Sequence, residues 1–165
     1  METQEHKDKV KDLKKKIDGI KIAMMTTEEP DGNLRSRPMA TNEMDEDGTL
    51  WFFTREFDPK VNEVNQNHKI NLSYSDPENN LYVSISGEAY SEKDKNKIEE
   101  LWQPHLKAWF PQGKDDPKIS LLKVNPTKVE YWDSESSNMV LIFNIAKSIL
   151  KGEKHESKEN IKISL

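Results

Sequence analysis

The sequence predicts a mainly β fold, an antiparallel β-barrel with helices only at its periphery. Three observations lead to this prediction. Short segments of alternating apolar and polar residues follow one another along the chain, as half-buried strands require. Tight-turn residues separate most of them, so neighbouring segments can pair as antiparallel hairpins. The helical patterns do not alternate regularly with the strands, which disfavours a parallel sheet.

The first elements are a helix and a hairpin. Apolar residues recur at helical spacing among lysines and acids over residues 5–17, which predicts an amphipathic helix. Residues 21–27 and 33–41 are strand candidates on either side of the Glu-Pro-Asp-Gly sequence at 29–32. Because Pro and Gly suit a tight turn, we expect these two strands to pair.

A buried strand and a short helix follow. Three consecutive aromatic residues within 49–55 indicate a strand that is covered on both faces. Asp58 and Pro59 then favour a helix start, because Asp caps free amides and Pro is preset for the first turn. Val61 and Val64 are expected on the inward face of this helix.

Two further strands are predicted at residues 68–75 and 81–90, where apolar and polar residues alternate with a period of two. A Pro- and Asn-containing turn at 76–80 separates them. Gly87 suggests a bulge or a point of close backbone approach where a barrel bends. These strands bring the sheet to at least five.

The C-terminal half predicts helices around one more strand pair. Residues 92–110 read as a helical segment that Pro104 must kink or divide. Residues 119–124 and 128–132 are expected to form a strand pair about the Asn-Pro sequence between them. A closing helix is expected over 139–150.

Length and composition indicate one domain over residues 1–165, with an N-terminal helix within 1–18 and a polar tail at 151–165. The 30 acids and 25 bases give a net charge of −5, so nucleic acid and anionic membranes are disfavoured as partners. There is no cysteine, which excludes disulfides and thiolate catalysis. The charged N-terminus does not resemble a signal peptide, and no run is long enough to span a membrane, so we expect a cytoplasmic protein.

The chain between residues 31 and 60 suggests a ligand site. It combines an arginine-containing hairpin at 35–41, the aromatic strand at 51–55 and the helix start at 58–60. Arginines, a threonine and a lysine would meet there beside apolar rings and a helix N-terminus, an arrangement suited to a phosphate next to a flat ring. A phosphorylated cofactor is therefore the first hypothesis.

Other kinds of site lack their motifs. The four histidines are widely scattered and form no paired metal-binding motif, so no metal site is expected. With six glycines in all, the chain has neither a Walker sequence nor a Gly-rich dinucleotide motif. No Ser-His-Asp arrangement can be singled out. If the chain binds a nucleotide, it must do so through a fold that uses neither of these Gly-rich motifs.

Four sequence pieces, taken in order, resemble the flavin-binding split-barrel family of pyridoxamine 5'-phosphate oxidase, and more closely its bacterial general stress protein 26 branch. The resemblance spans roughly residues 8–150 and rests on the order of the pieces rather than on any one. The pieces are Arg37-Pro38-Met39, then Phe53-Thr54-Arg55 with Lys60, then Trp109-Phe110-Pro111-Gln112-Gly113 with Asp116-Pro117, then Glu130-Tyr131-Trp132-Asp133.

The resemblance implies a split barrel that forms a homodimer with FMN, or alternatively FAD, in two grooves at the subunit interface. Arg37, Pro38 and Met39 would line the edge of the isoalloxazine ring. Thr54, Arg55 and Lys60 would lie near the ribityl chain and the phosphate, with Lys60 the firmest phosphate ligand. Ser84 and Ser86 could offer hydroxyl contacts, and Trp132 and Trp109 would close over the ring from the partner chain.

The chain also departs from the oxidase pattern. The vitamin B6 oxidases carry an Arg-Leu-His-Asp-Arg type segment shortly after the tryptophan, whereas Trp132 is followed here by Asp-Ser-Glu-Ser-Ser-Asn. The strand that supplies arginine and glutamine in the oxidases has only Ser84 and Ser86. We therefore expect no oxidation of pyridoxamine phosphate.

Each candidate also has an ordinary structural interpretation. Arg35 and Arg37 could be solvated charges on an edge hairpin, and Lys60 could be a helix-surface lysine. The aromatic residues at 51–53 and Trp102 are expected in the core. Trp109 and Trp132 stand beside polar loops, which favours a ligand-facing or dimer-facing role.

Three functions remain open. The leading hypothesis is a flavin-dependent oxidoreductase of unknown substrate, tied to the general stress response by its family branch, in which the cofactor carries the redox step. The alternative is a non-catalytic protein that binds or stores flavin, and the lack of a titratable His or Cys near the proposed ring favours a weakly catalytic protein. A barrel that binds nucleic acid or a protein partner without flavin is disfavoured by the acidic balance.

Overall fold

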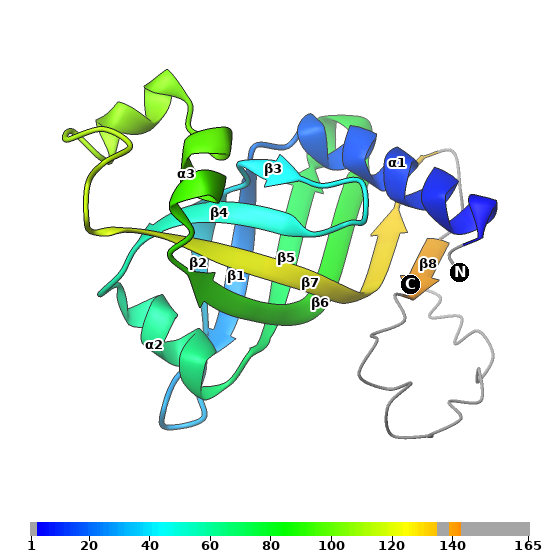
Figure 1. Cartoon of the computed structure of the whole chain (residues 1–165). Coiled ribbons are helices and arrows are strands. Elements are labelled where there is room, and N and C mark those ends of the chain that lie inside the picture. The colour runs from blue at the N-terminus through cyan, green and yellow to red at the C-terminus, as the bar shows by residue number, and fades with distance from the viewer. Residues whose placement is uncertain (1–2, 135–138, 143–165) are drawn as a thin grey trace.

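The computed structural model describes residues 3–134 and 139–142, and its β-strands form one curled antiparallel sheet (Figure 1). The strand order is β2-β1-β5-β6-β7-β4-β3, and β8 also pairs with β7. The strands are β1 (Ile22–Glu28), β2 (Leu34–Ala40), β3 (Glu43–Met44), β4 (Leu50–Arg55), β5 (Lys69–Asp76), β6 (Leu81–Glu92), β7 (Ile119–Trp132) and β8 (Met139–Ile142). The predicted mainly β, antiparallel fold class is confirmed.

Helices lie around this sheet rather than within it (Figure 1). They are α1 (Gln4–Asp18), α2 (Pro59–Gln66) and α3 (Lys95–Leu101), with the short 3-10 turns η1 (Pro77–Asn79) and η2 (Pro104–Ala108). The apolar stripe of α1 packs into the core of the half-barrel, and α3 lies near β4 and β7. Within the described residues, no helix has the length and apolarity needed to cross a membrane.

The predicted start of α2 is confirmed in detail. Asp58 has extended backbone angles and caps the helix by accepting a hydrogen bond from the Lys60 amide at 3.1 Å. Pro59 occupies the first turn, where its missing N–H leaves no intrahelical bond unmade. Val61 and Val64 are buried, as expected for the inward face.

The predicted hairpin is also confirmed, and its alternation separates two faces. β1 and β2 pair from Ile22 opposite Ala40 to Glu28 opposite Leu34. Along β2, Met39 is buried whereas Pro38 is exposed, because successive side chains of a strand point to opposite sides. The hairpin therefore presents one face to the core and one to the outside.

The prediction of two strands that pair about Asn125 and Pro126 is wrong. The structure has one continuous strand there, β7, of 14 residues. The chain absorbs Pro126 in a bulge, where Gly87 pairs with Pro126 but the preceding Ser86 pairs with Lys128. Thr127 is thus the extra residue. The predicted close approach at Gly87 is confirmed, because a Cβ there would lie 2.5 Å from the Asn125 carbonyl oxygen.

The predicted start of the helix after β6 needs correction, whereas the predicted division of that segment at Pro104 is confirmed. Within residues 92–110, β6 continues to Glu92, Asp94 caps a helix that ends at Leu101, and a separate 3-10 turn begins at Pro104. Asp94 sets the later start by accepting hydrogen bonds from two amides of the first turn, and Pro104 prevents one long helix.

The predicted closing helix at 139–150 is wrong over its first four residues. Met139–Ile142 forms strand β8, which pairs antiparallel with the end of β7. A short apolar run has no periodicity that separates helix from strand, and the open edge of β7 supplies pairing partners. Residues 143–150 of that prediction and the polar tail at 151–165 lie outside the described residues.

Two apolar clusters form the core. The first fills the curled sheet beneath α1 and α2 and includes Leu13, Met25, Phe52, Leu72 and Ile85. The second lies on the other side of β4, where Trp51 and Phe110 pack with α3, and partly buried Phe53 and Trp102 cover it. This explains the consecutive aromatics, because β4 has apolar cover on both faces.

Candidate functional site

A cluster of charged residues surrounds the start of α2. The Lys60 ammonium lies 2.6 Å from Asp58 Oδ2, and the Lys60 side chain is only 9% exposed. This burial contradicts the reading of Lys60 as an ordinary surface lysine. Burial opposes ionisation of Asp58, but hydrogen bonds from Lys60 and the charges of Lys60 and Arg37 lower its pKa below the ordinary value.

Arg37 belongs to the same cluster through Glu63 of α2. Its Nη2 donates to Glu63 Oε2 at 2.7 Å and its Nη1 donates to Thr27 Oγ1 at 2.8 Å. The Thr27 hydroxyl donates to the same Glu63 oxygen at 2.5 Å, which closes a three-membered network. Burial would raise the pKa of Glu63, but these hydrogen bonds and the Arg37 charge lower it. We call Thr27, Arg37, Asp58, Lys60 and Glu63 the α2 cluster.

Thr54 contributes an unpaired hydroxyl close in sequence to this cluster. Among the described residues, Thr54 Oγ1 is the one buried side-chain polar atom without a hydrogen-bond partner. It lies at the end of β4, and the tight turn that follows is closed by a 3.1 Å bond from the Asp58 amide to the Arg55 carbonyl. Since buried hydroxyls are nearly always bonded, this orphan suggests a missing partner.

A second group of predicted residues lies on the outer face of the sheet, away from the core. Direct Cα partners form one row across four strands: Pro38, Met24, Ser73 and Ser84. Asn71 Nδ2 donates to both predicted serines, at 3.0 Å to Ser84 and 3.3 Å to Ser86. Both hydroxyls keep capacity to donate elsewhere.

Trp132 extends this outer face, because its Cα partner is Tyr82, two residues from Ser84. Both aromatic side chains are exposed, as are Ile22 and Met24 on β1. We call Ile22, Met24, Pro38, Tyr82, Ser84, Ser86 and Trp132 the outer face. Its exposed apolar side chains lie beside Glu130 and Lys128, the Cα partners of Ser84 and Ser86, and such mixed surfaces with exposed apolar residues are commonly interaction sites.

Arg55 and Trp109 form a third group. The Arg55 guanidinium donates to the Trp109 carbonyl oxygen and lies 5.3 Å from the centre of the Phe110 ring. Arg55 is exposed on β4, whereas the neighbouring Thr54 is buried, so the two side chains point to opposite sides of the strand. Phe57, in the turn before α2, is 80% exposed.

Met39 is the predicted residue whose side chain is taken up by the core. It packs in the first apolar cluster and is buried. A ligand at this part of β2 would therefore contact Met39 through its backbone. The structure thus gathers Arg37 and Lys60 around Asp58, places Thr54 near the end of β4, and puts Pro38, the serines and Trp132 on the outer face of the sheet.

Two members of the α2 cluster escape sequence reasoning. Thr27 occupies an inward-facing position in the alternation of β1, so its sequence position does not distinguish it from an ordinary core residue. Glu63 gives no local signal of burial, because helical spacing turns its position away from the face that Val61 and Val64 share. Its partner on β2 is distant in sequence, so the pairing itself has no local signature.

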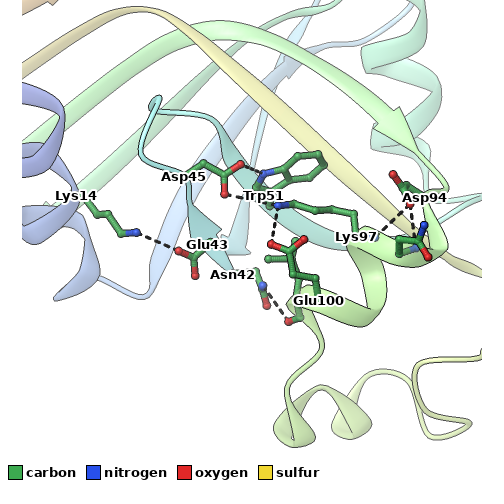
Figure 2. Close-up of polar contacts among 10 residues, drawn as sticks. Lys14, Asn42, Glu43, Asp45, Trp51, Asp94, Lys97 and Glu100 are labelled. Carbon is green, nitrogen blue, oxygen red and sulfur yellow. Dashed lines mark hydrogen bonds and ion pairs between the residues drawn. The ribbon is translucent and has the colours of Figure 1, made fainter. Parts of the chain in front are cut away.

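Another polar cluster, in Figure 2, is structural. The Trp51 Nε1 donates to Asp45 at 2.8 Å, and the Lys97 ammonium lies 5.0 Å from the centre of the Trp51 ring. Lys97 also pairs with Glu100 at 3.1 Å, and Asn42 donates to the last carbonyl of α3. These contacts fasten α3 to β3 and β4 and leave no charged member unpaired.

Two hollows lie elsewhere on the described chain. One of about 450 Å³ lies between α3 and the loop before β7 and is lined by residues including Lys93, Glu99 and Lys114. The other, of about 280 Å³, lies beside Lys16 and Asp133. Neither is lined by a predicted cofactor residue. Among the described residues, no group of three or more His, Cys, Asp or Glu side chains could hold a metal ion.

A family model and a curated relative each match most of this chain. The model of the family described as pyridoxamine 5'-phosphate oxidase like matches residues 8–156. A curated relative, Protein bli-3 of Neurospora crassa, is 27% identical over an alignment of 155 residues that covers 88% of this chain and 74% of that protein.

Solved structures agree with the fold. The general stress FMN/FAD binding protein from Xanthomonas citri is 28% identical with a TM-score of 0.67, covering 87% of this chain and 96% of that one. A Clostridium acetobutylicum protein related to general stress protein 26 of B. subtilis has a TM-score of 0.71 at 20% identity, covering 82% of this chain and 95% of that one. The latter likeness concerns the fold alone, and it confirms the predicted split-barrel class.

Proposed function

Because the chain belongs to the pyridoxamine 5'-phosphate oxidase-like family, we propose that it binds a flavin, with the flavin phosphate at the start of α2. The observation that carries this proposal is a buried cation in the first turn of α2 together with an orphaned buried hydroxyl near the end of the preceding strand β4. Lys60 is buried in the first turn of α2, and Thr54 Oγ1 lacks a partner four residues before the helix cap.

These residues fit the chemistry of a phosphorylated flavin. A helix N-terminus favours an anion, and the Lys60 ammonium adds a charge-assisted bond to a phosphate oxygen. The Thr54 hydroxyl can donate to a phosphate or ribityl oxygen and would then no longer be unsatisfied. Arg37 lies close enough to Asp58 to influence its ionisation, so it adds positive potential to the same place.

The outer face supports a second proposal, that the flavin lies between two copies of the chain. Arg37 and Pro38 are neighbours on β2, yet one side chain joins the α2 cluster and the other lies on the outer face. A single ligand cannot be enclosed by both groups of one chain. A partner that packs on the exposed outer face would bring its Trp132 toward the first copy, in keeping with what the family resemblance implies.

Within such a site we propose a flavin-dependent oxidoreductase of unknown substrate that uses FMN, or FAD in its place. The flavin supplies the electron-transfer chemistry when bound. The chain's own residues then bind and orient it: Lys60 and Thr54 at the phosphate end, the β2 backbone along the ring, and a partner's Trp132 as cover against water. The polar residues Asp133 and Ser134 after Trp132 argue against pyridoxamine phosphate as the substrate.

A non-catalytic flavin-binding role is the second candidate, and one observation favours it. Each charged candidate of the site is already engaged in the described chain: Arg37 with Glu63, Lys60 with Asp58, and Arg55 with Trp109. None of them is a group suited to transfer protons near neutral pH.

A visible absorption spectrum of the purified protein tests the proposal. We expect flavin bands near those of free FMN, and mass analysis of the released cofactor should give FMN or FAD. Adding NADH or NADPH and then air separates the two roles, because an oxidoreductase reduces and reoxidises its flavin over many cycles. A colourless protein that takes up neither flavin would refute flavin binding, and a monomer that retains flavin would refute the shared site.

A further inference from the structure

The charges around the start of α2 already balance without a ligand. Lys60 pairs with Asp58 at 2.6 Å, and Arg37 pairs with Glu63 at 2.7 Å. Two cations thus face two carboxylates, and all four side chains are half-buried or buried. A phosphate that binds here meets two cations that are already paired with carboxylates.

Asp58 accepts hydrogen bonds from the two donor groups of Lys60, its backbone amide and its ammonium, which an anion at this helix start could otherwise use. Its Oδ1 accepts from the Lys60 amide at 3.1 Å, while its Oδ2 contacts the Lys60 ammonium. The next amide, of Val61, donates to the Asp58 carbonyl at 2.9 Å. The Asp58 residue therefore occupies the part of the α2 N-terminus where Lys60 could hold a phosphate.

We propose that Asp58 is an internal competitor of the flavin phosphate and sets how strongly the site prefers phosphorylated over unphosphorylated flavins. This inference rests on the proposed function. To reach Lys60, a phosphate must take the ammonium from the carboxylate or bind beside a like charge, and either costs affinity. Riboflavin has no phosphate and does not enter this competition.

Glu63 does not share this role. Its Oε2 is held by both Thr27 and Arg37, and its side chain is 6% exposed, so it serves as the fixed counter-ion of Arg37. Asp58 differs because its side chain is one-third exposed and lies in the turn before the helix. Its carboxylate is therefore open to solvent and to an approaching phosphate, whereas that of Glu63 is not.

The test measures binding of FMN and of riboflavin to the full chain by quenching of flavin fluorescence. Asp58→Asn removes the charge but keeps the helix cap, because Asn caps about as well as Asp. We expect FMN to bind about tenfold more tightly than to the wild type, and riboflavin to change by less than about twofold. Asp58→Ser, which also caps, should act in the same direction.

Asp94→Asn is the matched control. Asp94 caps α3 through the amides of Asn96 and Lys97, far along the chain from Lys60, so its neutralisation should leave FMN binding unchanged (Figure 2). In a Lys60→Ala background, the gain from Asp58→Asn should shrink, because the contested cation is gone.

The outcomes separate the two proposals. If the wild type binds FMN but Asp58→Asn and Asp58→Ser bind it no more tightly, Asp58 is not a competitor and only the inference fails. If riboflavin gains as much as FMN, the effect does not concern the phosphate and the inference fails in the same way. If neither the wild type nor the variants bind either flavin, the proposed function itself fails and the inference falls with it.

Discussion

Replacing Glu63 by Gln should destabilise the protein far more than a change of one charge on a surface would. Glu63 Oε2 is the common acceptor for Arg37 and Thr27, and the two ion-pair side chains are 13% and 6% exposed. Gln keeps the size of the side chain and one acceptor but removes the charge. The Arg37 guanidinium then stays largely buried without the carboxylate that it contacts.

The magnitude follows from that burial. Removing one partner of a fully buried ion pair costs about 3–5 kcal/mol, and the remaining exposure of Arg37 with its bond to Thr27 reduces the expected loss to about 2–3 kcal/mol. Thr27→Val is the comparison, because it removes the hydroxyl but leaves both charges. We expect it to cost about 1 kcal/mol.

Urea unfolding at neutral pH, followed by tryptophan fluorescence, measures both losses. With a slope of about 2 kcal/mol per molar urea, Glu63→Gln should lower the midpoint by about 1 M. A midpoint within about 0.2 M of the wild type would refute the argument that Arg37 depends on this carboxylate.

The pH dependence gives an independent check. The pKa of Glu63 is lowered in the folded protein, so its contribution to stability is present above the unfolded value near 4.5 and is lost as pH falls through the folded pKa. The difference between wild type and Glu63→Gln should therefore shrink below about pH 4.5. A difference that stays constant down to pH 3 would contradict the ionised pair.

Three further predictions concern single side chains. Lys60→Ala should weaken FMN binding about tenfold while leaving riboflavin within about twofold, and equal losses for both would rule out a phosphate contact. Gly87→Ala should cost about 1–3 kcal/mol or more in urea unfolding, because the new Cβ meets the Asn125 carbonyl oxygen at 2.5 Å; an unchanged midpoint would mean that β7 shifts freely. Thr54→Val should stabilise the flavin-free protein by about 1 kcal/mol, since it removes a buried unpaired hydroxyl, and should weaken FMN binding; a loss of stability would show that the hydroxyl is satisfied.

Local signals predicted the elements that position the site. Asp58 and Pro59 mark the start of α2, because capping and a preset backbone angle act within a few residues. The β1–β2 hairpin follows from its turn and alternation, and Gly87 follows from the need for close backbone approach. Lys60 could also be expected near the end of β4, because only a short turn separates that strand from the start of α2.

Features that depend on distant partners could not be predicted in the same way. A proline normally interrupts a sheet, and only the bulge opposite Gly87 allows β7 to continue through Pro126. Met139–Ile142 is a strand because the edge of β7 is available, which its own residues do not reveal. The Arg37–Glu63 contact joins residues 26 positions apart, and nothing in either local pattern selects it.

The unbroken β7 also has a consequence for how the protein unfolds. Its neighbouring residues Leu121 and Leu122 belong to different apolar clusters, one beneath α3 and the other inside the half-barrel. Neither cluster can come apart without removing a shared strand from the other. The described sheet should therefore melt as one cooperative unit, with α3 and its surroundings unable to act as a separately folding subdomain.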